Sequence, residues 1–183
     1  MKEREIRAVY NTDTIRVYQA YSDIIADEAL RLGTFGPNFK MNRMTWIKPS
    51  FLWMMYRCGW AEKENQERVL AIDIKRESFD KAVKNAIIST YSDDLRISRE
   101  EWQKLIKSSE LRIQWDPEKD VDGNNLLYRS IQLGIRGNAL KEYVYDWITN
   151  VEDLTQYVNE LKLLRKRGVN ISSKLPKEKI YVI

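Results

Sequence analysis

The sequence predicts one α+β domain over residues 1–183, with a mixed or antiparallel sheet and flanking helices. Three observations predict this class. Residues 14–20, 111–115 and 128–135 alternate polar and apolar side chains with the period of a β-strand. Other segments repeat apolar residues at helical spacing, next to capping signals. The two kinds of segment do not alternate strictly, and no linker composition marks a domain boundary.

The first elements have clear start and stop signals. Residues 1–11 read as a charged lead-in, and TIRVYQA at 14–20 reads as a strand. Ser22 is a suitable N-cap for a helix that continues to Leu32. Gly33 follows at the position where a left-handed residue commonly ends a helix. Residues 34–42 should form a loop.

Residues 45–60, TWIKPSFLWMMYRCGW, hold the highest density of aromatic and methionine side chains in the chain. We expect an extended segment at 44–47, then a helix that Pro49 opens and Gly59 ends. A segment this apolar must be largely buried. Its charged residues Lys48 and Arg57 must therefore be paired, reach the surface or face a pocket.

The second half of the chain continues the mixture of strands and helices. Ser98 and Glu101 have the spacing of a capping box, which fixes the start of one helix. The remaining expected elements are a strand at 69–74, a helix at 79–88, a strand at 111–115, an acidic turn-rich loop at 116–125, a strand at 128–135, helices at 138–148 and 150–168, and an edge strand within 175–183.

Composition limits the chemistry that the protein can perform. The 183 residues include no histidine and one cysteine, which excludes catalytic triads, an internal disulfide and a Cys/His zinc site, so we expect no metal. The net charge of +4 mildly favours a phosphate-bearing or polyanionic partner. No apolar run is long enough to cross a membrane, and the charged N-terminus does not resemble a signal peptide. We expect a cytoplasmic protein without a membrane partner.

Polar side chains on two predicted strands are candidate ligand contacts. Ser130 and Gln132 share one face of their strand, and Gln114 lies on the polar face of the other. These groups suit a ribose, an amide or a phosphate, although a solvent-facing sheet surface would have the same pattern. Arg129 lies on the apolar face and needs an anionic partner there.

Cations surround the aromatic segment. Arg43, Lys48 and Arg57 could hold a phosphate while Trp46 stacks on a base or a nicotinamide. The alternative is that the aromatic side chains belong to the core, which is the usual place for tryptophan and methionine at helical spacing.

Three blocks of sequence resemble an uncharacterised family, the domain of unknown function 4291. They are IRVYQAYSDIIADEAL, RMTWIKPSFLWMMYRCGW, and RIQWDPEKD followed by LYRSIQLGIRG. The first block, extended to VYQAYSDIIADEALRLGTF, is more loosely similar to the opening of ADP-ribosyltransferase-like domains. There a first strand ends in a His or Arg that contacts NAD, and Gln19 occupies the matching position, with Arg16 and Tyr18 close by.

This similarity implies an ADP-ribosyltransferase-like fold and an NAD-utilising transferase acting on a protein or nucleic-acid acceptor. NAD would lie between residues 16–19 and the aromatic segment, with Arg43 or Arg129 on its pyrophosphate. Such enzymes commonly use a late Glu to stabilise the developing sugar cation, and Glu118 and Glu142 are the nearest candidates.

Two other functions stay open. One is a non-enzymatic basic domain that binds nucleic acid or nucleotides, and the other is an interaction module. If the protein is the transferase or the nucleic-acid-binding domain, we expect a nucleotide-type small molecule as its ligand, with nucleic acid as a further partner. The sequence leaves the oligomeric state open.

Overall fold

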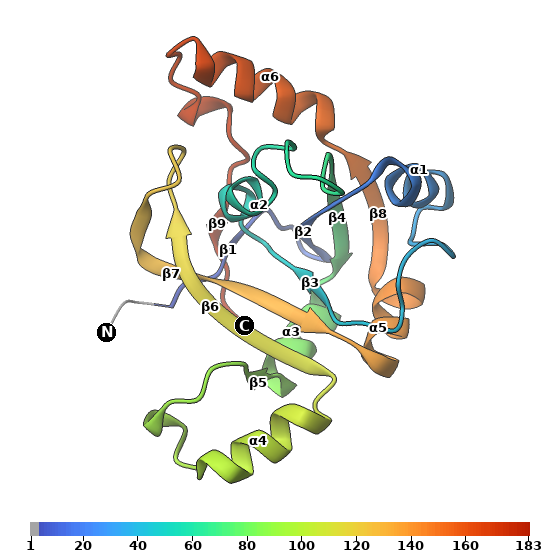
Figure 1. Cartoon of the computed structure of the whole chain (residues 1–183), viewed down its shortest axis with the longest axis vertical. Helices are drawn as coiled ribbons and strands as arrows, with labels where there is room; N and C mark the ends of the chain where they lie inside the picture. The colour runs from blue at the N-terminus through green and yellow to red at the C-terminus, as the bar shows by residue number, and fades with distance from the viewer. Residues whose placement is uncertain (1–3) are drawn as a thin grey trace.

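Two sheets pack against each other across the main apolar core of the protein (Figure 1). The computed structural model describes residues 4–183. The strands are β1 (Arg7–Ala8), β2 (Thr14–Tyr21), β3 (Thr45–Ile47), β4 (Arg68–Lys75), β5 (Ile87–Ile88), β6 (Leu111–Lys119), β7 (Asn125–Ile135), β8 (Ile148–Asp153) and β9 (Lys179–Ile180). The helices are α1 (Asp23–Leu32), α2 (Phe51–Cys58), α3 (Arg76–Asn85), α4 (Arg99–Ser108), α5 (Gly137–Glu142) and α6 (Thr155–Lys166), with short 3₁₀ turns η1 (Asp93–Leu95) and η3 (Ser172–Lys174) and a π-helical turn η2 (Tyr143–Trp147).

The strand pairing confirms an α+β domain with mixed and antiparallel sheets. Strands β2, β4 and β8 form one antiparallel sheet in the order β2-β4-β8. The second sheet has the order β3-β7-β6-β5, in which only the β5–β6 pair is parallel among the described residues. The short antiparallel pair β1-β9 places residues 7–8 beside residues 179–180.

Strand β4 is buried on both faces, which explains its nearly continuous apolar sequence. Leu70 and Ile72 belong to the core between the two sheets, together with Leu133 of β7. Val69 and Ala71 point the other way, into a second core cluster that α2 and α6 cover. A central strand in a layered domain is expected to show this pattern.

One backbone contact joins the two sheets at the end of β3. The amide of Tyr18 on β2 donates to the carbonyl oxygen of Lys48 at 2.7 Å, and the two residues form an isolated antiparallel bridge. The segment that leads into α2 is therefore fixed to both sheets, because β3 also pairs with β7.

The predicted helix boundaries are confirmed where capping signals are strong. Ser98 and Glu101 form the full capping box of α4. Gly33 and Gly59 adopt left-handed conformations, with φ of 71° and 59°, directly after α1 and α2. Helix α2 begins at Phe51 and not at Pro49 as predicted, and Ser50 is its N-cap, because the Ser50 hydroxyl accepts a hydrogen bond from the Trp53 amide.

Several predicted boundaries were wrong. Strand β6 continues to Lys119, so the loop expected at 116–125 shrinks to residues 120–124. Strand β8 occupies the start of the segment predicted as one helix over 150–168, and α6 begins only at Thr155. The spacing of Val151, Leu154 and Val158 fits a helix, and pairing with β4 overrides it.

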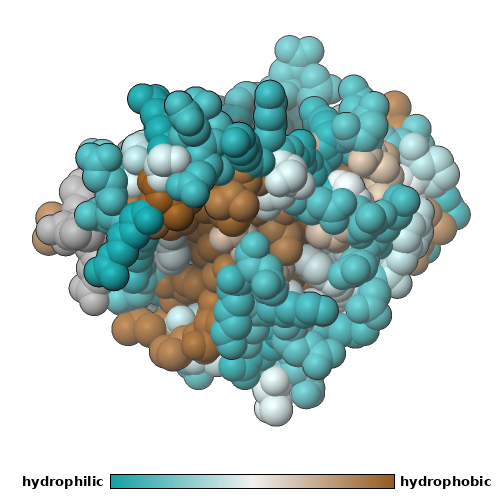
Figure 2. Space-filling model, turned by 90° about the horizontal axis from the view of Figure 1, so that it is seen from below, coloured by the Kyte–Doolittle hydropathy of each residue, from teal (hydrophilic) through white to brown (hydrophobic). Residues whose placement is uncertain are grey.

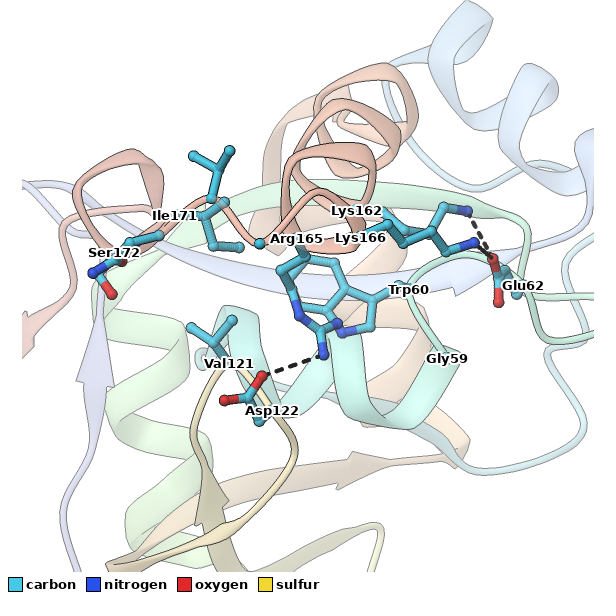
Figure 3. Close-up of a pocket in the computed structure, with 13 residues that line it drawn as sticks. Gly59, Trp60, Glu62, Val121, Asp122, Lys162, Arg165, Lys166, Ile171 and Ser172 are labelled. Carbon is cyan, nitrogen blue, oxygen red and sulfur yellow. Dashed lines mark hydrogen bonds and ion pairs between the residues drawn. The ribbon is translucent and has the colours of Figure 1, made fainter.

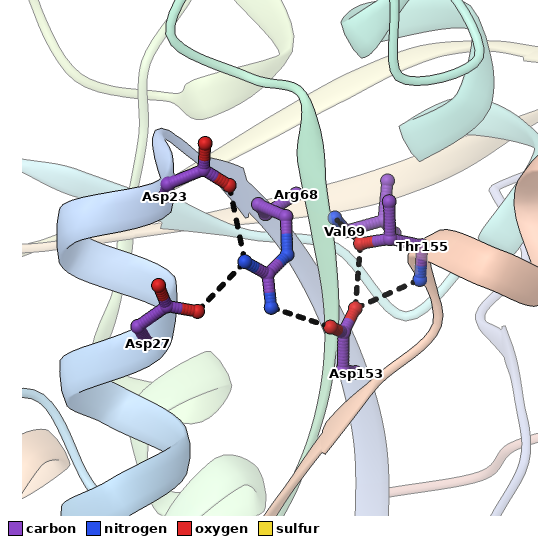
Figure 4. Close-up of polar contacts among 6 residues, drawn as sticks. All are labelled: Asp23, Asp27, Arg68, Val69, Asp153 and Thr155. Atoms are coloured by element: carbon purple, nitrogen blue, oxygen red, sulfur yellow. Dashed lines mark hydrogen bonds and ion pairs between the residues drawn. The ribbon is translucent and has the colours of Figure 1, made fainter.

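Arg68, the first residue of β4, connects this central strand to α1 and β8 (Figure 4). Its guanidinium donates to Asp23 at 3.0 Å and Asp27 at 2.7 Å on α1, and to Asp153 at 2.6 Å on β8. Asp153 in turn accepts hydrogen bonds from Thr155 at the start of α6. This network fixes α1 and α6 relative to the sheet.

Helix α4 lies at one end of the molecule and has no buried residue. It is held through Trp102, whose indole N–H donates to the carbonyl oxygen of Ile88 at 2.8 Å. Seen from this end, the surface is largely hydrophilic, with apolar side chains gathered around a hollow (Figure 2). Among residues 4–183, none of the helices is long and apolar enough to cross a membrane.

Candidate functional site

A polar cavity of about 440 Å³ lies where the two sheets meet, beside the Tyr18–Lys48 contact. Its size is within the range of small-molecule sites. We call it the Lys48 pocket, and residues from β2, β3, α2, β6, β7 and the adjoining loops form its wall. The lining residues are Gln19, Ala20, Tyr21, Arg43, Met44, Thr45, Trp46, Lys48, Met54, Arg57, Gln66, Gln114 and Gln132.

The floor of the pocket contains a buried lysine. Lys48 is only 5% exposed, and within residues 4–183 the one hydrogen bond of its ammonium is to the carbonyl oxygen of Trp46 at 3.5 Å. Among the described residues it forms no ion pair. Burial, followed by repulsion from Arg57, lowers the pKa of Lys48 from 10.5 to about 8.

Two arginines form the rim. Arg43, in the loop before β3, and Arg57, near the C-terminus of α2, are both exposed and line the cavity. Neither forms an ion pair with a carboxylate in the range that the structure describes. Three cations therefore surround one cavity without a direct carboxylate partner, an arrangement that suits an anionic ligand.

Asp116 does not line the Lys48 pocket, but it accepts hydrogen bonds from two glutamines that do. Gln114 and Gln132 are register partners on β6 and β7, and both side-chain nitrogens donate to Asp116. Among residues 4–183 no hydrogen bond is donated to the Oε1 atom of either glutamine. The oxygens of both amides therefore keep their capacity to accept a hydrogen bond.

Sequence reasoning missed Asp116 because the segment was predicted to turn there. The alternation of Arg112, Gln114 and Asp116 continues the polar face of β6 and could have revealed it.

Gln19 lies on the pocket wall, but both its amide nitrogen and its amide oxygen are already hydrogen-bonded within the protein. The nitrogen donates to Tyr21 Oη at 2.7 Å and Thr45 Oγ1 at 2.8 Å, and more weakly to the carbonyl oxygen of Trp46. Its oxygen accepts from Tyr143 Oη at 2.7 Å. Gln19 therefore positions β3 against β2 and leaves little capacity to bind a ligand.

Trp46 is half-buried and packs over Gly134, its partner on β7. A Cβ atom at Gly134 would lie 3.0 Å from the Trp46 ring and 2.7 Å from Met44 Sδ. The glycine thus sets the position of the indole in the pocket wall.

Of the candidate binding residues, the structure brings together in one cavity Gln19, Arg43, Trp46, Lys48 and Gln132. Arg16 and Tyr18 instead line a different cavity of about 570 Å³ near α6. Arg16 is paired with Asp73 at 2.8 Å and Glu152 at 2.9 Å.

Arg129 and Ser130 also lie outside the pocket. Arg129 donates to the carbonyl oxygen of Trp115 at 3.0 Å, so its partner is a backbone oxygen rather than the expected anion. Ser130 is buried, and its β6 register partner is Asp116.

The two candidate catalytic carboxylates are elsewhere. Glu118 is 3% exposed at the end of β6, where burial raises its pKa and the Lys119 amide hydrogen-bonds to it. Glu142 is exposed on α5 and lines a separate cavity near α3. Neither lines the Lys48 pocket, and residues 4–183 contain no cluster of acidic or cysteine side chains that could hold a metal ion.

A second basic cavity lies between α6 and the turn after α2 (Figure 3). Unlike the cations of the Lys48 pocket, its cations form ion pairs with carboxylates. Lys162 and Lys166 both contact Glu62, at 3.3 and 3.6 Å. Arg165 faces Asp122 at 3.6 Å and stacks on the Trp60 ring. Its cations are thus already matched by carboxylates, and the Lys48 pocket is the stronger candidate site.

These features define a two-sheet α+β domain with a cationic pocket at the junction of the sheets. The chain belongs to the family described as a domain of unknown function, DUF4291, whose model matches residues 5–181. A comparison with curated proteins finds no match.

Proposed function

We propose that the Lys48 pocket binds a phosphate-bearing nucleotide, with NAD as the first candidate, and that the protein is an NAD-utilising, ADP-ribosyltransferase-like enzyme. The observation that supports this proposal is the set of three cations, Arg43, Lys48 and Arg57, around one cavity without an ion-paired carboxylate. A buried charge without a partner is costly in the empty protein, and a bound phosphate would offset that cost.

Each part of the pocket suits a different part of a nucleotide. The guanidinium groups of Arg43 and Arg57 suit the pyrophosphate, because they bind phosphate oxygens bidentately and stay charged. The fixed Gln114 and Gln132 oxygens suit ribose hydroxyls. The Trp46 ring suits stacking on a base or on nicotinamide.

ADP-ribosyl transfer also needs a negative charge near the sugar as nicotinamide leaves. Glu118 and Glu142 do not line the pocket, whereas Asp116 is bonded to two residues that do. The proposal therefore gives Asp116 this electrostatic role.

The first experiment measures ligand-induced stabilisation. Saturating NAD or ADP-ribose should raise the Tm of the wild-type protein, because a ligand that binds only the folded state stabilises it by mass action. The Arg57→Ala variant should lose most of this shift, while Arg31→Ala, which changes an exposed arginine on α1, should keep it. Absence of a shift with NAD, ADP-ribose and ADP would contradict nucleotide binding.

The reaction is tested separately by nicotinamide release. The wild-type protein should release nicotinamide from NAD, and Asp116→Asn should reduce the rate by about 100-fold, the scale of a lost electrostatic contact in a transition state. If the protein binds NAD but releases no nicotinamide in the presence of candidate acceptors, it is a nucleotide-binding protein and the transferase proposal is wrong.

Nucleic acid is the second candidate ligand, because Arg43 and Arg57 are exposed at the rim, where a phosphate backbone could reach them. Affinity for single-stranded RNA or DNA should then fall steeply with salt. Affinity that does not change with salt would exclude this alternative.

A further inference from the structure

We propose that Lys48 is a reactive amine that forms a covalent imine with the carbonyl group of a phosphorylated ligand in the Lys48 pocket. This inference rests on the proposed anion site and gives its buried residue Lys48 a role as a nucleophile. The proposed function uses the positive charge of Lys48 beside the two arginines, and it does not require Lys48 to react.

The surroundings of Lys48 differ from those of a structural buried lysine. A structural lysine normally has a carboxylate partner, because an unpaired buried charge is costly. Lys48 has only a long contact to the Trp46 carbonyl oxygen among residues 4–183, although it is 5% exposed. Lys48 nevertheless lines a cavity, which offers a ligand a route to it.

Neighbouring charge also favours the neutral amine. Arg57, in the last turn of α2, repels the ammonium form, while Asp116 does not form an ion pair with it. Burial together with a nearby cation is a known way to activate a lysine for attack on carbonyl compounds. With a pKa of about 8, the neutral fraction near pH 7 is on the order of 100-fold larger than for an ordinary lysine.

The step is a condensation that needs no further reagent. The neutral Nζ adds to the carbonyl carbon, and the carbonyl oxygen takes up a proton. The oxygen then takes up a second proton and leaves as water. Nitrogen loses two protons in all, which balance the two that the oxygen gains, and a C=N bond replaces the C=O bond. An aldehyde or ketone that carries a phosphate is the expected ligand class, because Arg43 and Arg57 lie in the same cavity.

Pyridoxal 5′-phosphate is a suitable probe, since it combines an aldehyde with a phosphate. The full-length protein would be incubated with the probe at pH 7, reduced with borohydride and mapped by peptide mass spectrometry. We expect labelling at Lys48 to exceed labelling at exposed lysines such as Lys63 by at least about tenfold. Labelling at Lys48 should increase as the pH rises toward 8, whereas exposed lysines should continue to gain reactivity toward pH 10.

Three comparisons decide the result. Pyridoxal without phosphate should label Lys48 much less, and Arg57→Ala should reduce the preference for the phosphorylated probe. Lys48→Arg should lose the adduct, while Lys63→Arg should keep it. Because the wild-type map itself identifies the modified lysine, the test does not depend on whether the Lys48 variant folds.

Labelling spread over surface lysines, with Lys48 unmodified, would overturn the inference. If NAD or ADP-ribose still raises the Tm in that case, the anion site stands and only the reactive amine is lost. If both phosphorylated and unphosphorylated probes label Lys48 equally, the phosphate requirement is wrong.

Discussion

At the scale of single residues, Gln19 shows how a polar group can build a site without contacting the ligand. Its amide connects Tyr21, Thr45 and Tyr143, which come from β2, β3 and the π-helical turn η2. A network of buried hydroxyl groups around one amide is stable only while each member keeps its partner.

Replacing Gln19 with leucine should therefore destabilise the protein. The variant leaves several buried hydroxyls without their partner, and we expect the free energy of unfolding to fall by about 2–4 kcal/mol in urea titrations. Gln66→Leu is the matched control, since Gln66 lines the same pocket without such a network, and its effect should stay within about 0.5 kcal/mol. Equal effects of the two changes would contradict the role of Gln19.

Glu178 gives the clearest pH dependence. A carboxyl oxygen of Glu178 accepts a hydrogen bond from the Phe51 amide at 2.6 Å, at the start of α2. Burial, with repulsion from Glu118, raises the pKa of Glu178 from 4.5 to about 8. The folded state therefore holds a proton between these values that the unfolded state has lost, and the free energy of unfolding should fall as pH rises through this window.

Chemical denaturation of the wild type and Glu178→Gln from pH 5 to pH 8 checks this expectation. Glutamine keeps an oxygen acceptor for the Phe51 amide and cannot ionise, so the variant should lose much of the downward slope. The lowered pKa of Lys48 acts in a different window, above about pH 8, where it makes stability rise with pH. Parallel curves for the two proteins would show that Glu178 does not titrate in this range.

At the scale of elements, the pairing of β3 with β7 sets the shape of the pocket wall. Trp46 lies opposite Gly134, and the absence of a side chain there gives the indole its place. A glycine in a strand weakens the strand, so its position here is explained by the close packing of Trp46.

Gly134→Ala should displace Trp46 and Met44, because the added Cβ would lie 3.0 Å and 2.7 Å from their side chains. We expect a loss of about 1–3 kcal/mol in stability, together with weaker ligand binding. Thermal denaturation and NAD titration measure the two effects. Met44→Ala in the same chain should relieve part of the strain, and no recovery would indicate a different cause.

At the scale of the whole molecule, ionic contacts tie the helices to the sheets. Arg68 is the main case, since it bonds to α1 and β8 together and keeps only 19% of its side chain exposed. Its partners on α1 are largely exposed, so solvent screens part of the attraction.

Arg68→Ala should lower the free energy of unfolding by about 1–2 kcal/mol, and the loss should shrink at high salt. Lys75→Ala, which removes the more exposed contact to Asp146, should cost less than about 1 kcal/mol. Urea titrations at low and high salt measure both. A larger effect at Lys75 would contradict the role given to Arg68.

The sequence predicts those parts of the fold that local rules determine. The capping box at Ser98 and the glycine ends of α1 and α2 rest on contacts between near neighbours in the chain, and they are confirmed. Strand β8 depends on pairing with β4, about 80 residues away, and its sequence alone fits a helix equally well.

The residues of the candidate site also fall into two groups, those that the sequence indicates and those that depend on contacts between distant strands. Lys48 and Arg43 could be selected from composition around the aromatic segment. Asp116 and the separation of Arg16 from the pocket depend on strand register and on ion pairs between distant strands, which a single sequence does not specify.

The hydrogen bond from the Tyr18 amide to the Lys48 carbonyl oxygen joins the pocket residue Lys48 to β2, and β3 joins it to the other sheet. A ligand that contacts the Lys48 side chain would restrain the peptide group whose carbonyl oxygen accepts the Tyr18 hydrogen bond. Occupancy should therefore slow solvent exchange of the Tyr18 amide hydrogen, although Tyr18 itself faces another cavity. That one hydrogen would report, from outside the pocket, whether the pocket is filled.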